Sequence, residues 1–199
     1  MATHEVTFPI TDAQEILKLR AGDEVVVQGH IIGIRDRTQI RIFDQGQTPP
    51  MDLTGAFLLH TAPNVRKVAA GDGTVKYEKI CIGTTTSARM VRFTEPLGRQ
   101  YGVRAICGKG GFPDEAIEPM HRLGMVYFAI VGGAAALETT QIEAIDEVAW
   151  EDLMPECLWK FRVKDFGPLT VGIDAHGNSL YHDVQEAALK KLEELYAKL

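Results

Sequence analysis

Three apolar runs in the middle of the chain each end in a glycine-bearing turn, and this pattern restricts the fold more than any other feature. The turns begin at Gly83, Gly108 and Gly132, and a segment of helical character follows each of them. Repeated strand-then-helix units favour a parallel sheet, because consecutive parallel strands need a crossover connection. We therefore expect an α/β fold with a central, largely parallel sheet.

The two ends of the chain are richer in strands than in helices. Residues 24–34 form a β-branched run typical of a buried strand, in which Gly29 is a candidate bulge. Strand patterns recur at Gln141–Val148 and Leu158–Val163, and Leu169–Ile173 leads to a turn at Gly177 and Asn178. These strands predict a second, antiparallel layer beside the parallel sheet.

Helices and turns complete the outline of the chain. A short helix is expected at Asp12–Leu19, and a longer one at about residues 183–198, where Asp183 is the candidate start of a capping box. A polar turn is expected at residues 69–74. Because no repeat, low-complexity segment or linker interrupts the sequence, residues 1–199 are expected to form a single domain.

The charge and cysteine content argue against several classes of protein. The net charge of -6 argues against a nucleic-acid partner, because phosphate binding needs a basic patch. Cys81, Cys107 and Cys157 are too scattered for a disulfide framework or for a cluster-binding motif. The longest apolar run, residues 125–137, is too short and too rich in glycine to span a bilayer. With no signal peptide visible at the start, we expect a cytoplasmic protein without a membrane partner.

Cationic and hydroxyl-bearing residues gather where the predicted strands end. In an open α/β sheet, ligands bind outside the carboxyl ends of the strands. Thr84–Ser87 offers hydroxyls and backbone N–H groups there, and Arg89 follows Thr85 by one helical turn. Lys109 adds a point cation between glycines, and Arg35 adds a guanidinium fork suited to a carboxylate. Together these residues predict a site for a small dicarboxylate.

Each part of this site also has a plainer interpretation. Thr84–Ser87, taken alone, is most simply a helix N-cap cluster, and Arg35 with Asp36 is a surface ion pair of little consequence. Lys109 can be a solvated turn lysine, since the glycines around it lack the spacing of a phosphate-binding loop. His60 either lines the site or is a histidine satisfied by a neighbouring backbone group.

Four motifs give the chain a resemblance to the smaller subunit of class I fumarases and, more closely, of L-tartrate dehydratase. The family pattern contains G-D-x-v-x-l-x-G-x-i-x-x-x-R-D-x-x-H, then h-x-G-P, then G-P-T-T-x-x-R-M, then G-K-G-G. The resemblance covers nearly the whole chain, through Gly22–Asp36, His60–Pro63, Gly83–Met90, Gly108–Gly111, Met154–Trp159, Phe161–Leu169 and Ile173–Asn178.

The resemblance implies a three-layer β/β/α domain of the swivelling type, acting as the smaller subunit of an iron–sulfur-dependent hydro-lyase. The substrate would be a small dicarboxylic acid of the fumarate/malate or tartrate/oxaloacetate type. A larger alpha subunit would hold the 4Fe–4S cluster, none being bound by this chain alone, and the assembly would be a homodimer or a heterotetramer. By position, Thr85 would be the catalytic hydroxyl, and the substrate-binding residues would be Arg35, Gln39, Thr86, Arg89 and Lys109.

Three positions depart from the family pattern. Gln39 stands in place of the histidine of the first motif, Ala62 in place of the glycine of the second, and Thr84 in place of the proline of the third. Glutamine cannot carry a proton charge as histidine can, although its amide can hydrogen-bond a substrate oxygen. Two alternatives therefore stay open. One is a diverged, non-catalytic or regulatory dicarboxylate-binding subunit, and the other is a standalone α/β enzyme, for which the sequence offers no convincing nucleophile–base pair.

Overall fold

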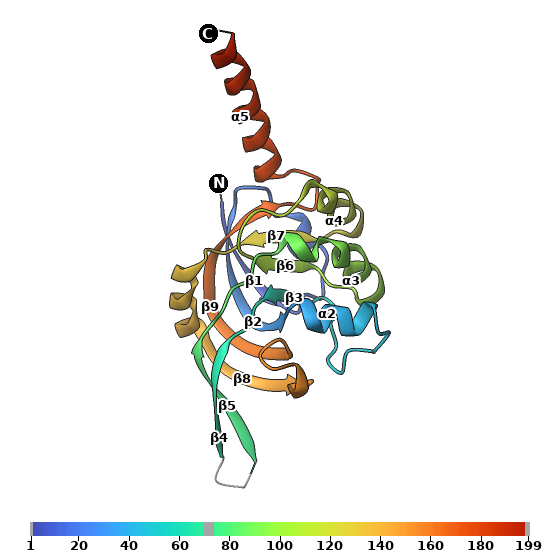
Figure 1. Ribbon diagram of the computed structural model, residues 1–199, viewed down its shortest axis with the longest axis vertical. Coiled ribbons are helices and arrows are strands. Elements are labelled where there is room, and N and C mark those ends of the chain that lie inside the picture. Colours follow the sequence, from blue (N-terminus) through green and yellow to red (C-terminus); the bar gives the residue numbers. More distant parts are fainter. Residues whose placement is uncertain (1, 70–73, 198–199) are drawn as a thin grey trace.

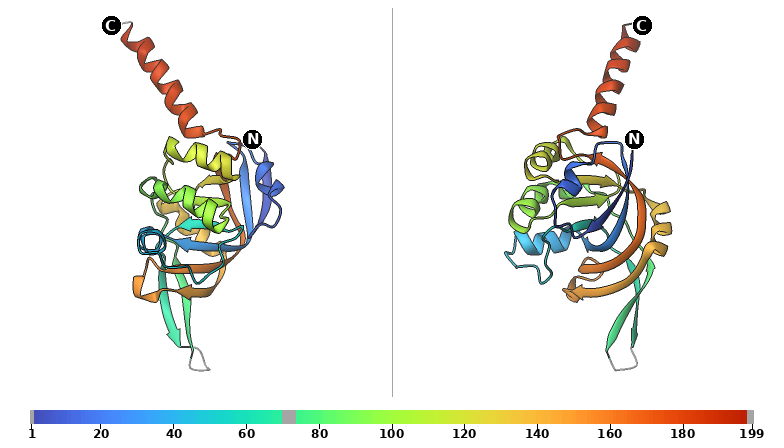
Figure 2. Two further views of the ribbon diagram at one scale, coloured as in Figure 1. Left: turned by 90° about the vertical axis from the view of Figure 1, so that its right-hand side faces the viewer. Right: turned by 180° about the vertical axis from the view of Figure 1, so that it is seen from behind.

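A computed structural model describes residues 2–69 and 74–197 of the chain, which form three layers (Figure 1). Helices α2 (Asp36–Phe43), α3 (Thr94–Tyr101) and α4 (Ile117–Leu123) cover one face of the central sheet. The antiparallel strands β8 (Ile142–Ala149) and β9 (Leu158–Ile173) curve across the other face, as the rotated views show (Figure 2). The expected β/β/α arrangement is confirmed.

The central sheet is parallel through five strands. Strand β2 (Glu24–Ile34) pairs in parallel with β1 (Thr3–Phe8) and β3 (Phe57–His60). Strand β3 pairs with β6 (Ala105–Gly108), and β6 pairs with β7 (Val126–Ala129), again in parallel. The carboxyl ends of these strands therefore meet at one edge of the sheet, where the site was predicted.

Strand β9 joins the two β layers. One edge of β9 pairs antiparallel with β2, and the other edge pairs with β8 and then with β7. The strand predicted at Leu158–Val163 is too short, because β9 runs on to Ile173. Asp165 and Gly167 have positive φ angles of 53° and 128°, and pairing with β2 resumes at Phe166. Gly29 has a φ of 89° at a shift in register between β2 and β9, so the predicted bulge is confirmed.

Alternation along the strands creates two separate hydrophobic cores. Phe57 and Leu59 of β3 lie in the core between the two β layers, whereas Leu58 lies in the core beneath the helices. Trp159 and Phe161 stack in the first core with ring centroids 6.2 Å apart. Because successive side chains of a strand point to opposite faces, a strand covered on both faces has to be apolar throughout. This is why the central runs lack the polar alternation of a surface strand.

The other helical segments before residue 180 are short. Helix α1 (Gln14–Leu17) is shorter than the helix predicted at Asp12–Leu19, and Asp12 Oδ1 accepts the backbone N–H of its first residue, Gln14, over 2.9 Å. Ile16 and Leu19 bury their side chains in the core between the β layers, and this packing holds the segment in place. The 3₁₀ segments are η1 (Ala88–Phe93), η2 (Asp114–Ala116), η3 (Gly133–Gln141) and η4 (Glu151–Leu153).

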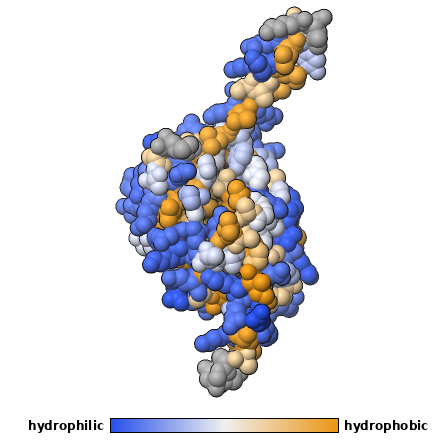
Figure 3. All heavy atoms as spheres, turned by 90° about the vertical axis from the view of Figure 1, so that its left-hand side faces the viewer, coloured by the Kyte–Doolittle hydropathy of each residue, from blue (hydrophilic) through white to orange (hydrophobic). Residues whose placement is uncertain are grey.

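The C-terminal helix α5 (Leu180–Tyr196) projects from the body of the molecule, and none of its residues is buried (Figures 1 and 2). The helix begins earlier than expected, because Ser179 rather than Asp183 is the N-cap and accepts a hydrogen bond from the backbone N–H of His182. Residue 198, its expected end, lies outside the described residues. Exposed apolar side chains run along the helix (Figure 3), namely Val184, Leu189, Leu192, Leu195 and Tyr196.

An antiparallel hairpin projects at the end of the molecule opposite α5 (Figure 1). It consists of β4 (Asn64–Ala69) and β5 (Val75–Cys81), which form a sheet of their own. Of the turn predicted at residues 69–74, positions 70–73 lie outside the described residues. Among the helices that the structure describes, none is long and apolar enough to cross a membrane.

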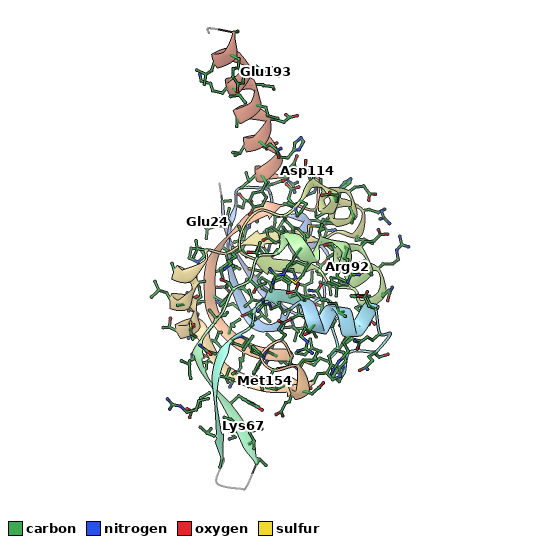
Figure 4. The ribbon with its side chains drawn as sticks, viewed as in Figure 1. Glu24, Lys67, Arg92, Asp114, Met154 and Glu193 are labelled. Atoms are coloured by element: carbon green, nitrogen blue, oxygen red, sulfur yellow. The ribbon has the colours of Figure 1, made fainter. Side chains whose placement is uncertain are left out.

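A histidine–carboxylate contact ties the base of α5 to the body, where Asp114 is labelled (Figure 4). His182 Nδ1 lies 2.8 Å from the Asp114 carboxylate, and this hydrogen bond and the charge of Asp114 raise the pKa of His182. The contact is therefore complete below about pH 6.5 and is lost as the pH rises through the raised pKa of the folded state. We expect hydrogen-exchange protection factors in the first turn of α5 to fall over that rise. A fall of the same size in His182→Ala would contradict this assignment.

Candidate functional site

Two turns at the carboxyl edge of the sheet are joined through their backbones. The N–H of Thr85 donates to the carbonyl of His60 at the end of β3 over 2.9 Å, and the N–H of Lys109 donates to the carbonyl of Thr85 over 3.1 Å. The N–H of Ser87 donates to the carbonyl of Lys109 over 3.2 Å, and Thr86 forms a parallel bridge with Lys109. The turns that follow Gly83 and β6 therefore lie side by side.

The segment around Thr85 is not the helix N-terminus that the sequence predicts. Residues 84–86 lie in extended bridges to neighbouring segments, and the six-residue 3₁₀ segment η1 begins only at Ala88. Ser87, which precedes η1, makes no side-chain capping bond. The N-cap interpretation is therefore wrong, and so is the shared helix face of Thr85 and Arg89. Backbone bonds to β3 and to the next turn position the threonines instead.

Glycine at position 108 allows the two turns to approach this closely. A Cβ atom at Gly108 would collide with Ser87 Oγ and would lie 3.1 Å from the carbonyl oxygen of Thr85. A Cβ atom at Gly83 would likewise collide with the carbonyl oxygen of Ala62. A side chain at Gly83 would have to displace backbone, and one at Gly108 would have to displace the Ser87 hydroxyl and press on the Thr85 carbonyl.

Arg35 and Arg89 reach the same edge from different elements and share one carboxylate. Arg89 Nε and Nη2 lie 2.7 and 2.8 Å from the two oxygens of Asp36, and Arg35 Nε lies 3.3 Å from Asp36 Oδ2. Burial alone would raise the pKa of Asp36, but the hydrogen bonds and charge of Arg89 outweigh it and lower the pKa. Asp36 engages only the Nε–Nη2 edge of Arg89, which leaves Nη1 uncommitted among the described residues.

Lys109 and Thr85 carry polar atoms that are free within the described ranges. The Lys109 ammonium has no ion pair there, and the Thr85 hydroxyl has no hydrogen bond there. Thr85 is only 7% exposed, yet its hydroxyl oxygen is not fully enclosed and still reaches solvent. Thr86 is exposed beside Lys109. The site thus presents one cation and two hydroxyls in addition to the arginines.

Gln39 lies beneath this surface rather than on it. Its side chain is completely buried on α2, where Nε2 donates to Met90 Sδ over 3.0 Å. Its Oε1 is enclosed and has no partner among the described residues. Direct contact between Gln39 and a substrate therefore requires the side chain to turn outward, and its predicted binding role stays a prediction.

Three residues near the site take roles that sequence patterns do not indicate. His60 is buried with Nδ1 2.8 Å from Ser87 Oγ, so it neither lines the surface nor depends on a backbone group for that bond. Asp36 binds both arginines, and the only sequence signal was its place beside Arg35. Tyr127 donates to the carbonyl of Gly108 over 2.8 Å, and nothing in its apolar run suggests this.

The described residues bring no cluster of metal ligands together. No group of three or more His, Cys, Asp or Glu side chains in those ranges is placed to hold a metal ion. Cys107 lies in the core between the β layers, where burial raises the pKa of its thiol well above the ordinary value. A thiol kept protonated by burial is a poor ligand for iron. The described residues thus offer no donor set that fits a 4Fe–4S cluster, which the resemblance assigns to the larger subunit.

Comparison with known proteins decides the family. The sequence model described as Fumarase C-terminus matches residues 3–184, which is most of the chain. The chain belongs to the fumarase C-terminus family. The match ends inside α5 and includes every candidate site residue, from Arg35 to Lys109.

Individual members of the fumarase C-terminus family align over most of this chain. The L(+)-tartrate dehydratase subunit beta of Escherichia coli (strain K12) is 39% identical over 176 residues, covering 88% of this chain and 85% of that protein. A Methanocaldococcus jannaschii protein, provisionally named as the same subunit, is 36% identical over 196 residues, or 96% and 98% of the two chains. A provisionally named class I fumarate hydratase of Geobacillus stearothermophilus is 35% identical over 187 residues, or 94% of this chain but 35% of that protein.

Proposed function

We propose that the chain is the smaller subunit of an iron–sulfur-dependent hydro-lyase that reversibly hydrates or dehydrates a small dicarboxylic acid. The observation that carries the proposal is the meeting of Thr85, Lys109 and Arg89 at one edge of the sheet. Relatives named for tartrate dehydratase and fumarate hydratase support the same class of reaction. A substrate of the fumarate/malate or tartrate/oxaloacetate type agrees with the cations of the site.

A dicarboxylate matches this edge in charge. Arg89 retains Nη1 after binding Asp36, Arg35 keeps most of its fork, and Lys109 adds a point charge. Guanidinium groups bind carboxylates in a fixed plane, while an ammonium group binds them as a compact charge. In the proposal these cations hold the two ends of the substrate, and the exposed hydroxyl of Thr86 donates a further hydrogen bond.

Thr85 is the residue that we propose for proton transfer. Its hydroxyl is unpaired within the described residues and nearly enclosed, so a reacting group could approach it with little competition from water. A free threonine hydroxyl is a poor base, because its pKa is so high that almost no alkoxide forms near neutral pH. Nearby positive charge lowers the cost of negative charge on the oxygen, and Lys109 and Arg89 supply it in this proposal.

A larger subunit completes the enzyme in the proposal. The Escherichia coli relative is by name a beta subunit, which implies a partner for that protein. The 4Fe–4S cluster, held by the partner, would supply Lewis-acid chemistry at the substrate's carboxylate and hydroxyl. The present chain would bind the carboxylates, present Thr85 and cover the substrate against water. Assembly as a homodimer or a heterotetramer is part of the same proposal.

Anaerobic co-purification from the native cells tests the proposal. We expect a partner of larger mass to co-elute with iron and sulfide, and we expect turnover on one member of a panel of fumarate, malate, tartrate and mesaconate. Lys109→Ala is expected to remove turnover without removing the partner. An iron-free homomer without partner or turnover would overturn the proposal.

Asp36 gives a sharper prediction about the two arginines. We expect Asp36→Asn to raise the KM for the dicarboxylate by about 10-fold and to change kcat by less than about 3-fold, because a neutral amide holds the guanidinium groups less firmly. Steady-state kinetics of the assembled enzyme measures both values. Asp44→Asn is the matched control, since Asp44 binds Arg92 through two hydrogen bonds of 3.0 and 2.7 Å outside the site. Equal effects of the two substitutions would contradict the assignment.

A non-catalytic dicarboxylate-binding subunit is the second candidate, and Gln39 is the observation that favours it. The family pattern has a histidine at this position, whereas the glutamine here is uncharged and buried. Calorimetry on the assembled complex distinguishes the two functions. Binding of a dicarboxylate without turnover would favour the second candidate, and binding with turnover would exclude it.

A further inference from the structure

A buried polar network lies directly behind the turn that carries Thr85. His60, Ser87 and Tyr127 are each at most 1% exposed. His60 Nδ1 lies 2.8 Å from Ser87 Oγ, and the backbone N–H of Ser87 donates to the carbonyl of Lys109 over 3.2 Å. Burying polar groups costs free energy unless they bond one another, so such a network fixes the geometry around it.

The network connects the two turns of the site. The Tyr127 hydroxyl donates to the carbonyl of Gly108 over 2.8 Å and lies 3.1 Å from that of Gly110. At the other end, the His60 carbonyl accepts the N–H of Thr85 over 2.9 Å. The Gly108 turn carries Lys109, so the bonds of His60 and Ser87 connect the segment of Thr85 with the turn of Lys109, and Tyr127 holds that turn from behind.

Only one side of the His60 ring takes part in this network. Burial lowers the pKa of His60 to about 3, outweighing the opposing effect of Asp36, so the imidazole is neutral at ordinary pH. His60 Nε2 is enclosed and has no partner among the described residues, whereas Nδ1 bonds Ser87. A side chain that places a polar atom at the Nδ1 position should therefore be able to replace the histidine.

We propose that His60 is a positioning residue which, through Ser87, sets where the Thr85 hydroxyl stands relative to the Lys109 ammonium. The inference rests on the proposed function, because it concerns the same site. His60 touches no substrate in this account. The two arginines are held separately by Asp36, so losing the network affects the chemical step more than substrate binding.

Paired substitutions in the assembled enzyme test the proposal. The amide of asparagine occupies the Nδ1 side of a histidine ring and can keep the bond to Ser87, whereas leucine fills similar space without any bond. We expect His60→Leu to lower kcat by about 10- to 100-fold with KM changed less than about 3-fold, because small misplacements of reacting groups have effects of this size. His60→Asn should stay within about 5-fold of the unmodified enzyme.

A double-mutant cycle shows whether His60 acts through Ser87. Ser87→Ala should lower kcat as His60→Leu does, and the double variant should be no worse than either, because both remove the same bond. Thr94→Val is the control, since Thr94 is buried in the helix layer and its hydroxyl has no partner among the described residues. Additive losses, equal losses for leucine and asparagine, or an equal loss in Thr94→Val would each overturn the proposal.

Amide hydrogen exchange provides a readout that does not need activity. In the isolated chain, His60→Leu should lower the protection of the Thr85 and Lys109 amides by about 10-fold or more, while His60→Asn preserves it. Unchanged protection in His60→Leu would overturn the positioning role. An inactive enzyme with this protection pattern would count against the proposed function alone and leave the positioning role supported.

Discussion

Arg89→Ala is expected to lower kcat/KM of the assembled enzyme by at least about 30-fold, since the loss of a hydrogen bond to a charged group typically costs about 2 kcal/mol. Two causes act together. First, the substrate loses a guanidinium contact. Second, Asp36, which in the unmodified chain binds Arg89 through both oxygens, is left with unbalanced negative charge where a dicarboxylate has to bind. Steady-state kinetics on the preferred dicarboxylate measures the loss.

Arg92→Ala is the matched control for this prediction. Arg92 lies on the same 3₁₀ segment, η1, and binds Asp44 through two hydrogen bonds just as Arg89 binds Asp36 (Figure 4). Its pair belongs to no part of the candidate site, and exposed ion pairs contribute little to stability. We expect kcat/KM within about 2-fold of the unmodified enzyme. Losses of the same size in both variants would show that Arg89 acts on the fold of η1 and not on the substrate.

Gly108→Ala is expected to lower the free energy of unfolding by about 2–3 kcal/mol and to abolish turnover. The new methyl group would collide with Ser87 Oγ and crowd both the carbonyl oxygen of Thr85 and the Cβ of His60. Relief requires the two turns to separate, which breaks the backbone bonds between Thr85 and Lys109. Urea unfolding of the chain gives the change in stability, and kinetics of the assembled enzyme gives the change in activity.

Gly133→Ala provides the control for the added methyl group. A Cβ atom at Gly133 meets nothing within 4 Å, and the residue begins the 3₁₀ segment η3. We expect its free energy of unfolding to stay within about 0.5 kcal/mol of the unmodified chain. If Gly108→Ala were as stable and as active as this control, the close approach of the two turns would not be a requirement of the site.

Much of the fold follows from local features of the sequence. The apolar runs at Val103–Cys107 and Met125–Val131 predict the strands that the structure shows as β6 and β7, because only strands covered on both faces lack polar alternation. Gly29 likewise predicts the bulge in β2 from a local feature, because the positive φ angle found there is one that glycine adopts without strain. The position of Arg35 directly after a strand also follows from the sequence, because β2 ends at Ile34.

The details of the site do not follow from local features. Spacing placed Thr85 and Arg89 on one helix face, but backbone bonds to His60 and Lys109 hold Thr85 between the bridges of its two neighbours. Asp36 looked like a minor partner of Arg35, and only the packing of η1 beside α2 shows that it also binds Arg89. The resemblance placed Gln39 among the substrate-binding residues, and only the position of α2 over the sheet shows that its side chain is buried.

The sequence by itself therefore determined the class of fold, the strands of the central sheet, the edge at which they end and the family pattern of the site. The tertiary structure alone decided that β9 is one strand joining both layers, that Asp36 holds two arginines and that His60 and Ser87 connect two turns. The physical reason is one of range. Strand and turn preferences act within a few residues, whereas these contacts join side chains separated by tens of residues, and their geometry is set by the register of the strands that carry them.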